Sequence, residues 1–321
     1  MLLNIIRQII TNIYKAVVSK KIYPLYDPKG KLNKKEEKII RRRVKDLFTS
    51  KLGSTITYSA DTIIISGFLG LNLLAQYQNY YYIFTSVLGL VGVVYNATRA
   101  GIGNSFVCET KEKNLKDLKT FSFLIFGIST CCISCFLGMY QPFMILWVGE
   151  KNLLPFSIVI CICVMFMLRY YKQLLMTYKD AAGMWHEDRF RPLIAGCANL
   201  LLNIVMVQFW GLYGVVLSTI ISEFVIEIPW LIHNLFATVF GMSSKKYIFI
   251  TIKYCMIALI IVVVSGVTTN LLPITGITFF IIRIILSLVI PITFLIVVYF
   301  KSEELKESMM IVKRMVLKNK K

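Results

Sequence analysis

Long apolar segments separated by short polar gaps dominate the sequence after residue 50. Each segment has enough residues, at 1.5 Å of helix rise per residue, to cross a hydrocarbon core of about 30 Å. The eight segments are residues 52–74, 81–107, 120–147, 154–178, 190–209, 212–239, 248–271 and 274–299. This pattern predicts an all-α integral membrane protein with eight transmembrane helices.

The gaps alternate between rich and poor in lysine and arginine. The rich gaps are residues 15–51 with 13 of these residues, 108–119 with 4, 169–191 with 5, 240–253 with 3 and 301–321 with 7. The poor gaps are residues 71–80, 208–213 and 270–276 with none and 141–153 with one. Because basic loops stay in the cytoplasm, the alternation predicts that both the N-terminal segment and the C-terminus are cytoplasmic.

Composition changes this picture little. The sequence has 321 residues, of which 57% are hydrophobic, a mean hydropathy of +0.68 and a formal net charge of +19. So much positive charge could indicate a nucleic-acid partner. Here, however, the charge lies in loops beside the spans, where anionic lipid headgroups supply the counter-charge. We therefore expect membrane lipids, and no nucleic acid, as partners.

The segments outside the spans read as amphipathic helices. In residues 1–22, basic residues lie among the apolar ones, so this segment has no uninterrupted apolar core of a signal peptide. Asn33 and Glu36 have capping-box spacing and open a second helix to about residue 50, which we expect to lie flat on the headgroups. The predicted organisation is the end of a preceding helix and a basic cytoplasmic amphipathic segment in 1–51, a six-helix lobe 52–239, two further helices within 240–300 and a basic cytoplasmic tail 301–321.

Polar residues recur at helical spacing inside four of the spans. Such stripes line helix contacts or watery cavities, because lipid-facing helices have no use for them. The stripes are Ser50, Ser54, Thr57 and Asp61; Thr85, Gly89, Gly92, Asn96, Arg99 and Gly103; Gly196, Asn199 and Asn203; and Thr219, Ser222, Glu223 and Glu227. From them we select Asp61, Asn96, Arg99, Asn199, Asn203, Glu223 and Glu227 as candidate residues of a substrate or ion cavity.

Charges inside a span must be paired, hydrated or close to an interface, since each costs roughly 2.5–3.5 kcal/mol at the bilayer centre. Two interpretations fit: an internal ion-pair network that holds the bundle together, or a cavity that binds substrate or couples an ion. Glu223 and Glu227 lie one turn apart, so their repulsion favours protonation of one unless a cation lies between them. Arg169 either belongs to this interior or extends to the cytoplasmic interface.

Signatures of enzymes and metal sites are absent from the sequence. It has no phosphate-binding G-x-x-x-x-G-K-[ST] motif, no G-x-S-x-G motif and no long external loop for a catalytic domain. Cys132 and Cys135 have C-x-x-C spacing but lie in an apolar span, and the only histidines, His186 and His233, lie elsewhere. We expect neither enzymatic activity nor a cofactor or metal.

Five segments together resemble a known family. They are KLGSTITYSADTIIISGFLGL (51–71), YQNYYYIFTSV (77–87), FMILWVGE (143–150), YKDAAGMWHEDRFRPLIAGCANLLLNI (178–204) and GLYGVVLSTIIS (211–222). In their combination they resemble the C-terminal portion of Wzx-type flippases of the MATE-like MOP superfamily, over residues 1–240.

The resemblance implies a bacterial inner-membrane transporter. Its expected substrate is an undecaprenyl-pyrophosphate-linked oligosaccharide, carried to the outer leaflet for O-antigen, capsule or exopolysaccharide. Family members have two six-helix lobes, commonly followed by two extra helices; residues 52–239 would be the second lobe and 240–300 the extras. A first lobe is then expected on another chain. Arg99 would contact phosphate, and Asp61 or Glu223 would carry the coupling ion.

Two other functions remain open at this point. A MATE-type drug or metabolite exporter would share the architecture and would also use carboxylates inside the membrane. An inactive, truncated remnant is the third possibility, because alternating access needs two bundles that move against each other.

Overall fold

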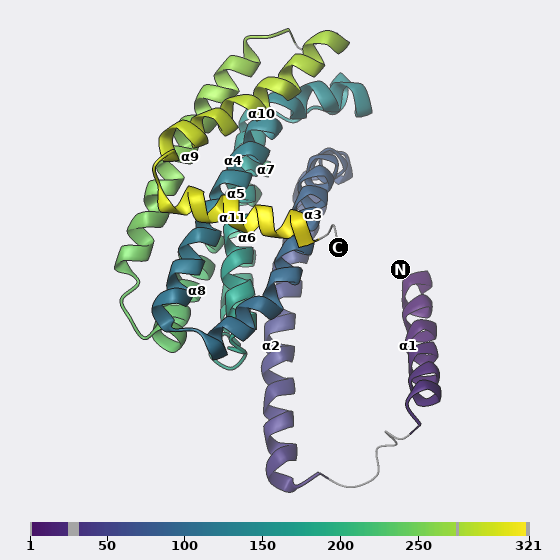
Figure 1. The fold of residues 1–321 in the computed structure, drawn as a ribbon. Helices are drawn as coiled ribbons and strands as arrows, with labels where there is room; N and C mark the ends of the chain where they lie inside the picture. Colours follow the sequence, from purple (N-terminus) through teal and green to yellow (C-terminus); the bar gives the residue numbers. More distant parts are fainter. Residues whose placement is uncertain (1, 25–31, 274–275, 319–321) are drawn as a thin grey trace. The chain divides into compact units, whose positions relative to one another are not determined.

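The computed structural model describes residues 2–24, 32–273 and 276–318, and every regular element in these ranges is helical (Figure 1). The main helices are α1 (Leu2–Ile22), α2 (Lys34–Ile64), α3 (Leu71–Cys108), α4 (Lys111–Val148), α5 (Phe156–Ala181), α6 (Arg191–Trp210), α7 (Leu212–Ser222), α8 (Ile228–Leu235), α9 (Lys245–Asn270), α10 (Ile277–Tyr299) and α11 (Glu303–Lys318). Short π-helical turns are η1 (Ile65–Leu69), η3 (Glu223–Glu227) and η4 (Phe236–Phe240), and η2 (Glu150–Asn152) is a 3₁₀ turn. The contacts divide the chain into two units, Met1–Lys45 and Asp46–Lys321.

Six helical stretches of the described residues are long and apolar enough to cross a membrane. They are Lys111–Val148, Phe156–Ala181, Arg191–Trp210, Leu212–Phe240, Lys245–Asn270 and Thr278–Tyr299. They coincide with the third to eighth predicted segments, although residues 274 and 275 of the eighth lie outside the described residues. The prediction of an all-α membrane protein is confirmed, whereas the number of eight crossings stays a prediction.

The predicted boundaries around the first two segments differ from the structure. The helix that begins at Lys34 continues without a break through Ile64, so the expected separate helix ending near residue 50 is wrong. The chain turns at Gly70, not in the predicted gap 71–80, which is the first part of α3. Gly70 has φ +89°, a backbone conformation that is unfavourable for residues other than glycine. Hydrogen bonds explain how the polar residues of this gap are accommodated in a helix: Tyr80 donates to Gln141 at 2.7 Å.

Within the larger unit, α4 and α5 form the centre. The long helix α4 packs against α5, α9, α10 and α11, and α5 also packs against α3 and α7 (Figure 1). Buried aromatic rings join these helices: Phe166 of α5 meets Phe84 of α3 and Phe136 of α4 edge-to-face, with ring centroids 5.5 and 5.0 Å apart. Such pairs add about 0.5–1.5 kcal/mol each beyond burial of their area.

Glycine permits the closest helix crossing around α6. A Cβ on Gly53 of α2 would overlap the backbone of Pro192 and Leu193, and one on Gly196 would lie 2.8 Å from the carbonyl oxygen of Gly53. Small residues let helix backbones approach in this way in membranes. The approach brings the polar stripe of α2 beside α6.

Contacts between gaps follow the alternation of basic and non-basic loops. Asp46 contacts His186 at 2.8 Å, which joins the basic gaps 15–51 and 169–191. Lys116 contacts Glu307 at 2.6 Å, which joins the basic gaps 108–119 and 301–321. Gln76 donates to the carbonyl of Lys151 at 3.4 Å, so two lysine-poor gaps meet as well. This grouping is what the alternating pattern requires of successive crossings; which side is cytoplasmic stays a prediction.

Candidate functional site

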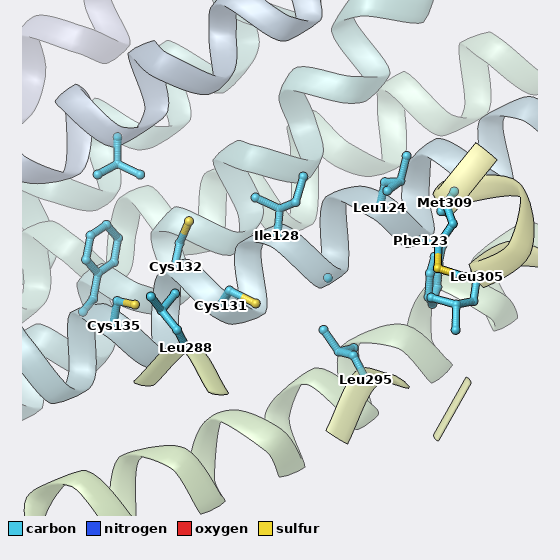
Figure 2. Close-up of a pocket in the computed structure, with 14 residues that line it drawn as sticks. Phe123, Leu124, Ile128, Cys131, Cys132, Cys135, Leu288, Leu295, Leu305 and Met309 are labelled. Atoms are coloured by element: carbon cyan, nitrogen blue, oxygen red, sulfur yellow. The ribbon is translucent and has the colours of Figure 1, made fainter. Parts of the chain in front are cut away.

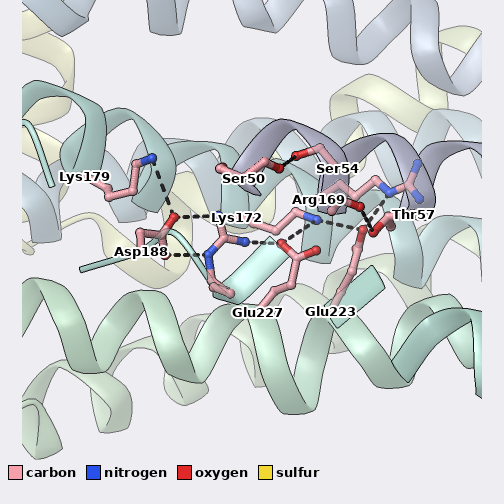
Figure 3. Close-up of polar contacts among 11 residues, drawn as sticks. Ser50, Ser54, Thr57, Arg169, Lys172, Lys179, Asp188, Glu223 and Glu227 are labelled. Carbon is pink, nitrogen blue, oxygen red and sulfur yellow. Dashed lines mark hydrogen bonds and ion pairs between the residues drawn. The ribbon is translucent and has the colours of Figure 1, made fainter. Parts of the chain in front are cut away.

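A network of ion pairs lies between α3, α5, α6 and the helix that contains η3. We call it the charge network and define it as Arg99, Arg169, Lys172, Lys179, Asp180, Asp188, Arg191, Glu223 and Glu227. Its centre is Lys172 of α5, whose ammonium group lies 2.9 Å from Glu223 and 3.2 Å from Glu227 (Figure 3). A cation therefore lies between the two carboxylates and offsets their mutual repulsion.

Two arginines extend the network in opposite directions from this centre. The Nε of Arg169 donates to Glu223 at 2.8 Å, and its Nη1 donates to the hydroxyl of Tyr81 at 2.5 Å. On the other side, Arg191 donates from Nη1 to Glu227. It also donates two hydrogen bonds, of 2.7 and 2.9 Å, to the carboxylate of Asp188. Arg169 thus belongs to the interior, and the alternative that it extends to the interface is wrong.

The network ends at a residue that is partly exposed. Lys179 lies 3.5 Å from Asp188 and 2.9 Å from Asp180, and Asp180 in turn lies 3.1 Å from the guanidinium of Arg99. The side chain of Arg99 is 40% exposed, compared with 2% for Arg191 and 1% for Glu223. A continuous series of ion pairs therefore runs from the buried Glu223 to Arg99 on the surface of α3.

The network contains five cations and four carboxylates. Nearly complete pairing is what makes such burial tolerable, because an isolated buried charge costs several kcal/mol. Pairing also means that removal of any one member weakens the charge compensation of its neighbours. Of the two interpretations left open by the sequence, an ion-pair network is present, and it reaches the surface of α3.

The π turn η3 places the two glutamates. Pro229 follows it and has no backbone N–H, so the helix interior loses one hydrogen bond at this point. The backbone responds with a wider turn, in which the N–H of Ile228 donates to the carbonyl of Glu223 five residues earlier. Wide turns of this kind occur often at functional sites.

Asp61 lies in a second, separate cluster. Its carboxylate accepts hydrogen bonds from Asn203 at 3.0 Å and from Thr219 at 3.1 Å, and Asn203 also donates to Asn199 at 3.3 Å. The hydroxyl group of Ser218 donates to the side-chain amide oxygen of Asn203. Asp61 is buried and forms no ion pair among the described residues. Within the described part of the chain, the groups that donate hydrogen bonds to this carboxylate are neutral.

The predicted site residues therefore fall into two clusters and an exposed stripe. Asp61, Asn199 and Asn203 form one cluster, Arg99, Glu223 and Glu227 belong to the charge network, and Asn96 lies exposed on α3. That these residues line a cavity stays a prediction.

Part of the polar stripe of α3, from Thr85 to Asn96, faces no neighbour among the described residues. Thr85, Gly89 and Asn96 are exposed, and a Cβ added to Gly89 or Gly92 would meet nothing within 4 Å in the described part of the chain. If α3 crosses the membrane as the sequence predicts, a polar and small-residue face is unusual where lipid covers it. The face has the chemistry of a surface that meets water or another helix bundle.

Sequence reasoning missed Lys172, Lys179, Asp188 and Arg191. All four fall within the basic gap 169–191, although the predicted segments 154–178 and 190–209 also include Lys172 and Arg191; the structure places Lys172 and Lys179 inside α5. The spacing of Arg169, Lys172 and Lys179 (offsets 0, 3 and 10) keeps them on one helical face and could have revealed them. Their ion-pair partners include residues far away in the sequence, so the local sequence pattern does not indicate which residues pair.

A different cavity lies between α4, α10 and α11. It has a volume of about 780 Å³ and is lined almost entirely by carbon and sulfur atoms, including Cys131, Cys132 and Cys135 of α4 (Figure 2). Leu288 and Leu295 of α10 form the opposite wall, with Leu305 and Met309 of α11 at one end. Such a lining suits a hydrocarbon chain and offers little to a polar ligand.

In comparisons with protein-family models, curated proteins and solved structures, none matches this chain.

Proposed function

We propose that this chain forms one lobe of a flippase in the bacterial inner membrane. It would cross the membrane eight times, with both ends in the cytoplasm, and act with a first lobe on another chain. Its substrate would be an undecaprenyl-pyrophosphate-linked oligosaccharide, moved to the outer leaflet for O-antigen, capsule or exopolysaccharide synthesis. The family resemblance of residues 51–222 supplies the identity of the substrate.

The observation that carries the proposal is Arg99 on the exposed polar stripe of α3. Its side chain is 40% exposed, and its guanidinium is held by Asp180, the last carboxylate of the charge network. Arginine binds phosphate oxygens with two parallel hydrogen bonds, so an arginine with a partly exposed side chain is suited to a pyrophosphate group. In the proposed cycle, pyrophosphate competes with Asp180 for Arg99, and the ion pairs behind Asp180 rearrange.

Asp61 is the better candidate for the coupling ion of the two that the sequence offered. Glu223 already has two cations at 2.8 and 2.9 Å, which oppose the binding of a proton or a sodium ion. Asp61 has amide and hydroxyl donors instead, so a proton or a sodium ion could supply its missing positive charge. Carboxylates of this kind form ion pathways in transporters.

The apolar cavity adds support for a lipid-linked substrate. At about 780 Å³ it has room for part of a hydrocarbon chain, and α4 joins it to the same bundle as the charge network. A substrate with a polar head and a prenyl tail requires both kinds of surface.

The proposal is tested by deleting the gene in its own host and measuring surface polysaccharide and lipid-linked oligosaccharide. Deletion should remove the polymer and cause the lipid-linked precursor to accumulate in the inner leaflet. Wild-type protein should restore the polymer, and Arg99→Ala should not, although it inserts in the membrane normally. Arg41→Ala, which removes an arginine exposed on α2, is the matched control and should restore it.

Other results would exclude the proposal. Drug sensitivity without loss of polymer would indicate an exporter, and no phenotype at all would indicate an inactive remnant. Full activity of Arg99→Ala would exclude the phosphate contact.

A further inference from the structure

A basic recess between α4 and α9 lies apart from the charge network. It has a volume of about 530 Å³ and is lined by Lys119 of α4 and by Lys245, Lys246, Phe249 and Ile250 of α9. The three lysines come from two gaps that are more than a hundred residues apart in sequence. Their convergence is therefore a result of the fold.

Among the described residues, the lysines of this recess have no anionic partner. Lys116, one turn before Lys119, takes the nearby Glu307 and Glu303 at 2.6 and 3.6 Å. Lys119 also borders the recess that contains these two carboxylates. Within the ranges that the structure describes, no carboxylate forms an ion pair with Lys119, Lys245 or Lys246.

The start of α9 adds to the positive potential. Its first turn contains no acidic residue and has Lys245 and Lys246 instead, and the side chain of Ser244 caps no backbone N–H. Helix N-termini carry partial positive charge and favour anions, so two lysines there are unfavourable unless an anion binds. The recess and the helix terminus call for the same kind of ligand.

Further along α9 from the lysines, the exposed surface is apolar. Phe249 is 72% exposed, and Ile252, Met256, Leu259 and Val263 continue an exposed apolar face along α9. α9 is one of the helices that could cross a membrane. A molecule bound by the lysines would thus lie beside an apolar protein surface. A phospholipid could place an acyl chain on that surface, whereas free phosphate would have no group to place there.

We propose that the recess of Lys119, Lys245 and Lys246 binds the phosphate headgroup of an anionic phospholipid, with an acyl chain along Phe249 and the apolar face of α9. Both gaps are predicted to be cytoplasmic, and basic sites between transmembrane helices on that side bind acidic headgroups. Each lysine near an anionic surface contributes about fivefold in affinity. The site is independent of the proposed transport function.

The experiment is native mass spectrometry of the purified full chain in detergent, titrated with phosphatidylglycerol or with phosphatidylcholine of the same acyl chains. We expect tighter binding of phosphatidylglycerol. The variant K119Q/K245Q/K246Q should lose on the order of 100-fold of that affinity and bind phosphatidylcholine unchanged. The all-arginine variant of the same positions keeps the charge and should keep the preference, which separates loss of charge from loss of fold.

A matched control removes the same charge elsewhere. K34Q/K35Q/K38Q changes three exposed lysines at the start of α2 and should leave phosphatidylglycerol binding unchanged. An equal loss in this control would mean that net charge alone attracts the lipid and would overturn the proposal. So would equal affinity for the two lipids, or displacement of phosphatidylglycerol by excess inorganic phosphate, which would assign the recess to a free anion.

Discussion

Replacement of Lys172 by methionine is the sharpest test of the charge network. Methionine has nearly the same length and shape but no charge, so the packing of α5 stays and one ammonium group disappears. Glu223 and Glu227 then face each other without the cation that lies 2.9 and 3.2 Å from them. Both side chains are buried, so water cannot replace the lost charge.

The magnitude follows from what remains. Removal of one partner from a buried ion pair costs about 3–5 kcal/mol. Glu223 keeps Arg169 at 2.8 Å and Glu227 keeps Arg191, so we expect the lower end, about 3 kcal/mol. The 321 residues give an unfolding entropy of about 0.7 kcal/mol/K, so this loss corresponds to a fall of about 4–5 °C in the midpoint of thermal unfolding.

The measurement is thermal unfolding of the purified protein in one detergent, followed by tryptophan fluorescence. The control is Lys253→Met, which removes an exposed lysine from α9 and should change the free energy of unfolding by less than about 0.5 kcal/mol. If Lys172→Met unfolds at the same temperature as this control, the ion pairs of Lys172 with the two glutamates do not stabilise the fold.

A double-mutant comparison gives the sign of the coupling. In the Glu223→Gln, Glu227→Gln background, Lys172 has no carboxylate to neutralise and lies between two arginines. Lys172→Met should therefore raise stability in this background, although it lowers stability in the wild type. A loss of stability in both backgrounds would refute the reasoning and indicate that the packing of the lysine stem dominates.

Three further predictions concern helix packing, the second cluster and α11. Gly196→Val should lower the unfolding midpoint by the equivalent of about 1–3 kcal/mol, since a Cβ there lies 2.8 Å from a backbone oxygen, whereas Gly89→Val, with open space around it, should not. Asp61→Asn keeps an acceptor for its neighbours and should cost less than about 1.5 kcal/mol, but transport in vesicles should stop responding to an imposed ion gradient. The hydrogen bond from Lys116 lowers the pKa of Glu307 from its ordinary 4.5, so the protection of α11 from hydrogen exchange should hold above about pH 4.5 and fall as pH drops through the lowered pKa. Glu307→Gln should show no such step in acid.

Much of the fold could be predicted because the constraint is local. Each apolar segment must be helical to satisfy its own backbone hydrogen bonds in hydrocarbon, whatever its neighbours do. The third to eighth segments therefore coincide with helices of the structure. The exception near residues 70–80 has a tertiary cause, because Tyr80, Gln76 and Gln78 form hydrogen bonds with distant residues and let α3 begin early.

The candidate site was predicted only in part. Asp61, Glu223 and Glu227 stood out because a carboxylate inside an apolar run is conspicuous on its own. Lys172 and Arg191 did not, because they lie in a gap rich in basic residues, where a cation needs no explanation. Polar residues of α3 were grouped with the others by their spacing, yet the fold leaves Asn96 exposed and gives Arg99 to the charge network.

By itself, the sequence determined that the protein is helical, that it belongs in a membrane and that its buried charges need partners, since hydrocarbon imposes these conditions on each segment separately. Only the tertiary structure decided which partners they have. Arg169 and Lys172 reach Glu223 across 54 and 51 residues of sequence, and Arg191 reaches Glu227 across 36. Such pairings depend on how the helices pack and rotate against one another, and no periodicity along a single helix contains that information.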